Sequence, residues 1–126
     1  MQNFFGGVPV VTSVLDVSSA ELMAPRNSRY EVVNQILADL DAAIAGLPLE
    51  QSIVAADKGR ISKGAAQAFK AKVLLYEATW RKYVGNTTDF QGSAGPASDQ
   101  INAFLSEAIA LSKEVMESGA YSLWNQ

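Results

Sequence analysis

Residues 62–83 read SKGAAQAFKAKVLLYEATWRKY, and this stretch decides the fold class. Apolar residues recur in it at three- and four-residue spacing, which predicts a helix over about 63–83 with Ser62 as its N-cap. One predicted stripe contains Ala65, Phe69, Val73, Tyr76 and Trp80, and a second contains Ala71, Leu74, Leu75 and Ala78. Polar residues leave only a narrow strip that we expect to face water: Gln67, Lys70, Glu77 and Arg81. A helix that is apolar around most of its circumference is normally central, with neighbours on two sides.

A second helix is predicted over about 29–46. Ser28 and Glu31 have the spacing of a capping box, in which each side chain bonds to the backbone N–H of the other residue. Apolar residues then follow at helical spacing: Val33, Ile36, Leu37, Leu40 and Ile44. Gly46 and Pro48 predict its end.

A third helix is predicted over about 99–118, with Ser98 or Asp99 as its cap and Gly119 just beyond its end. Its predicted face consists of Ile101, Leu105, Ala108, Ile109, Ser112 and Met116, widened by Phe104, Leu111 and Val115. We expect Tyr121, Leu123 and Trp124 to fold back on the helices. The fold class is therefore all-α, with paired antiparallel helices that suggest a tetratricopeptide-like unit.

The segments between the helices are long and irregular. Residues 4–27 show no helical period and are expected to form a loop, with one short strand around Val8, Val10 and Val11. Residues 47–61 form a linker, and residues 84–97 form a Gly-, Ser-, Thr- and Pro-rich loop. That last loop is longer than the roughly 2–8 residues usual between packed helices.

The composition excludes several classes of function. The 126 residues carry a net charge of -3, which gives no basic footprint for nucleic acid. The sequence has neither Cys nor His, so no nucleophile–base pair or usual zinc ligand is expected, and no cofactor is predicted. Gly6, Gly7 and Pro9 interrupt the apolar start, which we interpret as the middle of a longer chain and not as a signal peptide.

Four stretches, in this order and spacing, resemble the SusD/RagB family. They are NFFGGVPVVT at 3–12, PRNSRYEV at 25–32 with ADLDAAI at 38–44, GRISKGAA at 59–66 running on to Tyr76, and residues 108–123 ending in SGAYSL. The resemblance covers nearly the whole of residues 1–126 except the 84–97 loop, and suggests a single helical segment of a larger SusD-like protein.

The resemblance implies a function that the residues alone do not. Family members are lipid-anchored proteins on the outer face of the outer membrane, with a helical, tetratricopeptide-like core. They capture oligosaccharides or polysaccharides, or in some members peptides, and cover a TonB-dependent transporter without breaking bonds. The chain lacks the anchoring Cys. We therefore expect a non-catalytic nutrient-binding component whose present part is mainly scaffold and transporter-docking surface. The alternative is a general tetratricopeptide-like interaction module without glycan binding.

The candidate ligand-binding residues lie at the end of the 63–83 helix and in the loop after it: Trp80, Tyr83, Asn86, Asp89 and Phe90. Sugars stack on exposed aromatic rings, and Asn or Asp side chains bind their hydroxyl groups. The alternative is that Trp80 and Tyr83 complete the core stripe of the helix, as buried aromatic residues commonly do.

Overall fold

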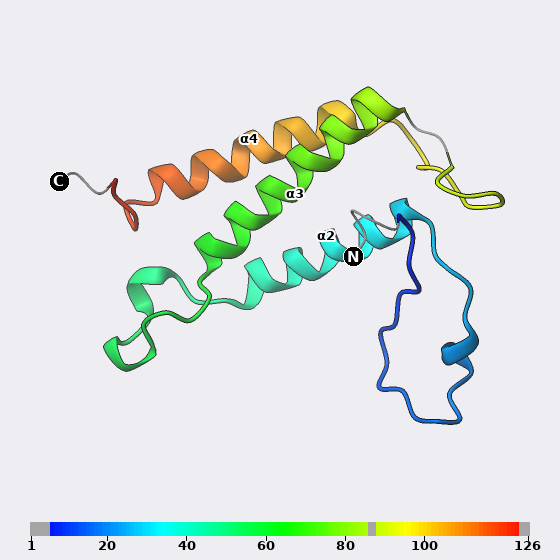
Figure 1. The fold of residues 1–126 in the computed structure, drawn as a ribbon. Helices are drawn as coiled ribbons and strands as arrows, with labels where there is room; N and C mark the ends of the chain where they lie inside the picture. Colours follow the sequence, from blue (N-terminus) through cyan, green and yellow to red (C-terminus); the bar gives the residue numbers. More distant parts are fainter. Residues whose placement is uncertain (1–5, 86–87, 124–126) are drawn as a thin grey trace.

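The computed structural model describes residues 6–85 and 88–123, and three long helices dominate this part (Figure 1). They are α2 (Arg29–Gly46), α3 (Lys63–Val84) and α4 (Ile101–Glu117). Three short 3-10 helices, η1 (Ala20–Met23), η2 (Glu50–Ser52) and η3 (Ala55–Asp57), lie in the connecting segments. The all-α class and the positions of the three helices are confirmed.

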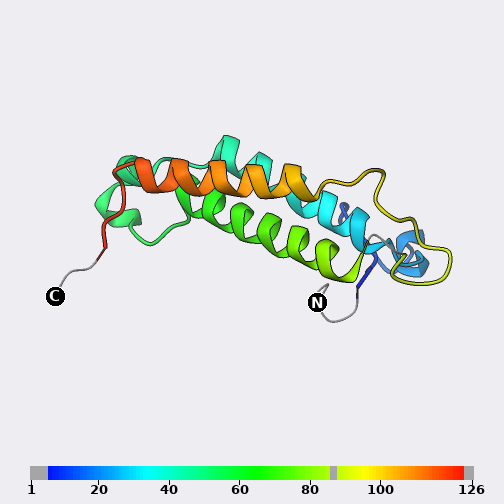
Figure 2. The same ribbon diagram turned by 90° about the horizontal axis from the view of Figure 1, so that it is seen from above.

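Successive helices run in opposite directions, and α3 packs against both α2 and α4 (Figures 1 and 2). The prediction of a central helix with neighbours on two sides is therefore confirmed. Nothing in this arrangement tests whether the pairing is of the tetratricopeptide type, which stays a prediction.

The helix ends follow local chemistry. The Ser28–Glu31 capping box is formed at α2, and Ser62 accepts a hydrogen bond from the Ala65 amide at α3. The predicted cap of α4 is wrong, because the helix begins two residues later with Gln100 as its N-cap. Asp99 does accept a bond from the Ile101 amide at 3.0 Å, while the Gln100 side chain is held by Arg81 on α3 at 3.1 Å. The Gln100 side chain is therefore used in a tertiary contact and does not cap the helix.

The short strand expected around Val8–Val11 is absent from the described residues. Only isolated bonds hold this extended segment: Val8 accepts from the Asn27 amide, and the Val10 amide donates to the Asn27 side chain. A strand needs a partner ladder, and no such ladder can extend past Asn27, because the next residue, Ser28, is the N-cap of α2.

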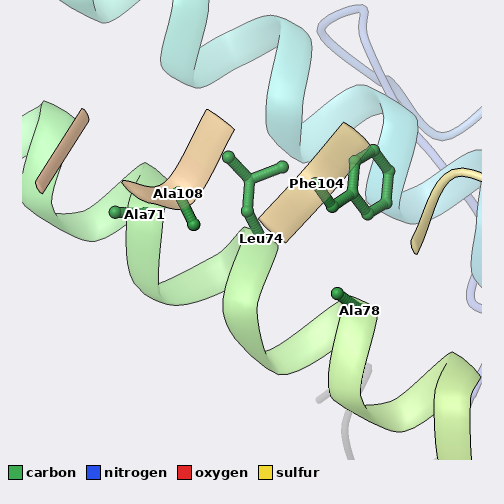
Figure 3. Close-up of a cluster of buried hydrophobic side chains, with 5 residues drawn as sticks. All are labelled: Ala71, Leu74, Ala78, Phe104 and Ala108. Carbon is green, nitrogen blue, oxygen red and sulfur yellow. The ribbon is translucent and has the colours of Figure 1, made fainter. Parts of the chain in front are cut away.

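Small residues bring α3 and α4 together around a compact apolar cluster (Figure 3). Ala71, Leu74 and Ala78 of α3 face Phe104 and Ala108 of α4, and all five are buried. Because alanine side chains are short, the two backbones approach closely and the Leu74 side chain is enclosed completely.

The C-terminal segment is fixed to the start of α3 through Tyr121. Its hydroxyl lies 3.0 Å from the Ser62 hydroxyl, and a Cβ added at Gly64 would lie only 2.6 Å from the same Tyr121 oxygen. The expected return of Tyr121 onto the helices is therefore confirmed. Leu123 does not follow it, since its side chain is almost fully exposed, and Trp124 lies outside the described residues.

Candidate functional site

The polar strip of α3 is buried, which overturns the prediction that it faces water. Gln67, Lys70, Glu77 and Arg81 are all buried. Each of them meets a partner on α2, on α4 or at the N-cap of α4: Arg29, Asp41, Gln100, Glu107 or Glu114. A buried charge is tolerated only when it is paired and hydrogen-bonded. These pairings therefore turn the polar strip into the contact surface of the three helices.

Glu77 is the centre of the most deeply buried part of this network. Its two carboxylate oxygens lie 2.7 Å from Arg29 Nη2 and 2.9 Å from Arg81 Nε, and all three side chains are almost completely buried. Aromatic rings cover the two cations: the Arg29 guanidinium lies 4.0 Å from the Trp80 ring centre, and that of Arg81 lies between Tyr30 and Phe104. Within the described residues, Arg29 Nε and Arg81 Nη2 have no hydrogen-bond partner. The cation–π contacts with the rings offset part of the free-energy cost of burying these nitrogen atoms without a hydrogen bond.

Lys70 joins all three helices at a second point. Its ammonium group lies 2.5 Å from a carboxylate oxygen of Asp41 on α2 and 2.5 Å from one of Glu107 on α4. Burial by itself lowers the pKa of the lysine, but the two carboxylates outweigh burial and hold the pKa above its ordinary value. This lysine is therefore a charged structural contact, and not a neutral amine available as a base.

Asp89, a predicted ligand residue, holds the ends of three segments together. Its Oδ2 atom accepts bonds from the Gly7 amide at 2.7 Å and from the Arg29 amide, the first of α2, at 2.9 Å. Burial alone raises the pKa of this carboxyl. Hydrogen bonds from Ser93 and from the amides of Arg29 and Gly7 reverse the effect and lower the pKa. The position at the N-terminus of α2 also favours a negative charge.

The other predicted ligand residues lie in different environments. Trp80 is partly buried under Arg29, and Phe90 lies 4.9 Å from the Arg26 guanidinium. Tyr83 is 78% exposed. Asn86 lies outside the described residues. Arg29 brings Trp80 and Asp89 together, one through its side chain and the other through its amide. A role in ligand binding for the set stays a prediction.

Large apolar side chains line the outer side of α3, where the sequence predicted core. We call Phe69, Val73, Tyr76, Trp80 and Tyr83 the aromatic face. Phe69 is 55% exposed and Tyr76 is also exposed, while Val73 and Trp80 are partly buried. The prediction that this stripe is buried is wrong, because α2 and α4 pack on the ionic side of the helix. Phe69, Tyr76 and Tyr83 are seven residues apart, so they form one line along α3.

A second apolar surface, the α3/α4 groove, lies between the two helices and has a volume of about 980 Å³. Its lining includes Leu75 of α3 with Ile109 and Met116 of α4. Ile109 and Met116 were predicted on the packed face of their helix, yet both are well exposed. Phe104, predicted only at the edge of that face, is buried in its place. The sequence pattern places these residues on one side of α4 but does not locate its neighbour.

The described part of the chain offers neither a metal-binding cluster nor a membrane-spanning helix. No three His, Cys, Asp or Glu side chains in residues 6–85 and 88–123 gather closely enough to hold a metal ion. None of the helices seen there is long and apolar enough to cross a membrane. The described residues present an interior of paired charges beside a small apolar cluster, with exposed apolar surfaces on α3 and between α3 and α4.

Comparison with protein-family models, with curated proteins and with solved structures finds no match to the chain.

Proposed function

We propose that the chain is a non-catalytic part of a SusD/RagB-type nutrient-binding protein, which works with a TonB-dependent transporter in the uptake of glycans at the outer face of the outer membrane. Within that assembly, the chain acts mainly as a helical scaffold that docks the transporter. Family and location rest on the sequence resemblance. The docking role rests on the aromatic face of α3.

The exposed residues of the aromatic face support docking, because exposed aromatic side chains lower solubility and these add no packing to the core. Phe69, Tyr76 and Tyr83 remain exposed along one line although α3 has two packed neighbours. Contiguous exposed apolar surface of this kind marks protein interaction sites. Aromatic residues are also enriched where binding energy concentrates at interfaces.

The ionic interior supports the scaffold role. Glu77 and Lys70 each connect charged groups from different helices, so the relative positions of α2, α3 and α4 are fixed by directional contacts. A rigid surface loses less conformational entropy on binding. By contrast, Trp80 and Asp89, which were candidates for sugar contacts, already have partners within the chain.

Direct binding to the transporter tests this proposal. The purified chain is immobilised, and a detergent-solubilised TonB-dependent transporter from the cell that produces it is passed over it. We expect Phe69→Ser with Tyr83→Ser to weaken binding at least roughly tenfold, as loss of interface aromatics commonly does. Val54→Ser, which removes an exposed apolar side chain from the linker between α2 and α3, is the matched control and should bind normally.

The outcomes separate the possible functions. If the native chain does not bind the transporter, the proposed function is wrong. If the double variant binds as well as the native chain, the aromatic face is not the docking surface. Capture of other proteins with the same aromatic dependence would favour the general interaction module. Titration with an oligosaccharide panel completes the test, since saturable binding that depends on Tyr83 would make the face a sugar platform instead.

A further inference from the structure

Residues 8–27, which we call the apolar loop, are closed at the base by three contacts. The Arg26 Nε atom donates to the Gly7 carbonyl at 2.7 Å, the Asn27 amide donates to Val8 at 3.3 Å, and the Val10 amide donates to the Asn27 side chain at 2.9 Å. The loop projects from the N-terminal end of α2 and away from the helices (Figure 1). Its two ends therefore meet at a fixed point on the scaffold.

Local hydrogen bonds also organise the outer part of the apolar loop. Asp16 Oδ1 accepts from the Ser18 amide and hydroxyl, each at 2.7 Å, and the Asp16 amide donates to the Ser19 hydroxyl. The 3-10 helix η1 follows directly. These contacts hold the pKa of Asp16 below its ordinary value, so the carboxylate stays ionised as part of the turn.

This organised loop presents apolar side chains to solvent. Val14 and Val17 are each 99% exposed, and Met23 is 89% exposed. The outer part of the loop also carries the carboxylates of Asp16 and Glu21, while its one cation, Arg26, is bonded to the Gly7 carbonyl at the base. A pre-organised apolar surface is suited to docking, because little conformational entropy remains to be lost on binding. The two negative charges disfavour an anionic membrane surface as the partner.

The α3/α4 groove has the complementary character. Leu75, Ile109 and Met116 supply its apolar lining. Lys72 and Lys113 add two positive charges from the two helices, against the single carboxylate of Glu117. Lys113 is paired only loosely with Glu117, at 3.8 Å between highly exposed groups. The groove therefore fits an apolar segment that carries carboxylates.

Within one molecule the two surfaces lie apart. The groove is lined by the first half of α3 and by α4 as far as Glu117, whereas the base of the loop is attached near the end of α3, where Asp89 binds Gly7. We propose that the apolar loop of one copy docks into the α3/α4 groove of a second copy. Because the two surfaces differ, the contact is head-to-tail, and each molecule keeps one free loop and one free groove.

Complementation between two variants tests this contact. The loop variant carries Val17→Glu and Met23→Glu, and the groove variant carries Ile109→Glu and Met116→Glu. All four positions are highly exposed, so folding should not depend on them. Sedimentation equilibrium of the native chain should show association that rises with concentration and falls with added salt, which screens the lysine–carboxylate contacts. Each variant alone should associate at least roughly tenfold more weakly.

A one-to-one mixture of the two variants is the decisive sample. The loop variant keeps an intact groove and the groove variant keeps an intact loop, so the mixture should form a complex of two chains and stop there. The control Val54→Glu should associate like the native chain. Three results would each overturn the proposal. The native chain could stay monomeric up to about 1 mM, the mixture could stay monomeric, or the control could lose association as much as the variants do. None of these results depends on the transporter or on the aromatic face.

Discussion

The Arg29 guanidinium lies 2.7 Å from the Glu77 carboxylate, although 48 residues separate them in the sequence and both side chains are almost completely buried. This contact fixes the first residue of α2 against the third turn from the end of α3. Arg81 binds the other Glu77 oxygen, so one carboxylate neutralises two cations only in part. The interior at this end of the helices is therefore held by charge as well as by apolar packing.

Glu77→Gln should destabilise the protein strongly. The substitution keeps the size of the side chain but leaves two buried arginines without a counter-charge. Breaking a buried ion pair by removing one partner costs about 3–5 kcal/mol. The free energy of unfolding measured in urea should fall by that order. Glu117→Gln, in the exposed pair with Lys113, is the control and should cost less than about 1 kcal/mol. Similar losses in both variants would contradict the role of Glu77.

Asp89 should make stability sensitive to acid. Its pKa is lower in the folded chain than in the unfolded one, so its contribution is present above the ordinary value of 3.8 and is lost as the pH falls through the folded pKa. Thermal unfolding between pH 7 and pH 2 should therefore show a smaller decrease in melting temperature for Asp89→Asn than for the native chain. Glu31, whose pKa is also lowered by Ser28, adds to the acid loss in both proteins. Parallel curves for the two proteins would contradict the role of Asp89 in holding the three segments together.

Gly7→Ala should open the base of the apolar loop. A Cβ at this position would lie 1.8 Å from the Asn27 carbonyl oxygen, a backbone atom that cannot move without its neighbours. We expect faster limited proteolysis within residues 8–27 and loss of stability. Gly46→Ala is the matched control, because nothing lies within 4 Å of the added atom at the last residue of α2. It should be neutral or stabilising by up to about 1 kcal/mol.

Trp80→Ala and Tyr83→Ala should behave differently although both residues were predicted to bind ligand. Trp80 is partly buried and stacks on Arg29, so its truncation should lower stability, by less than the roughly 3–5 kcal/mol of a fully buried aromatic. Tyr83 is mostly exposed, so its loss should change stability by no more than about 0.5 kcal/mol. Calorimetric melting of both variants checks this. Equal melting temperatures would place Trp80 outside the core.

The candidate site was predictable only in part. The sequence predicted a ligand-binding role for Trp80 and Asp89, and that role stays a prediction. Within the chain both residues contact Arg29, which no sequence pattern connects to them. The one available signal was Arg29 itself, a charged residue at the first position of a capped helix. The ionic partners of Lys70 lie 29 and 37 residues away, on other helices. Ion pairs between residues so far apart produce no pattern in the local sequence.

The sequence by itself determined where α2 and α3 begin and end, because capping, glycine stops and apolar spacing act within a few residues. It missed the start of α4, where Gln100 is the N-cap. Only the tertiary structure decided which side of α3 is buried. The sequence pattern allowed both apolar stripes to pack and the polar strip to be solvated. In the structure the second stripe does pack, through Ala71, Leu74 and Ala78, but the polar strip beside it is buried as well. Complementary charges on α2 and α4 made burial of the polar strip possible, and Phe69, Tyr76 and Tyr83 of the aromatic face remained exposed as a consequence. That choice depends on residues far apart in the chain, so no local pattern contains it.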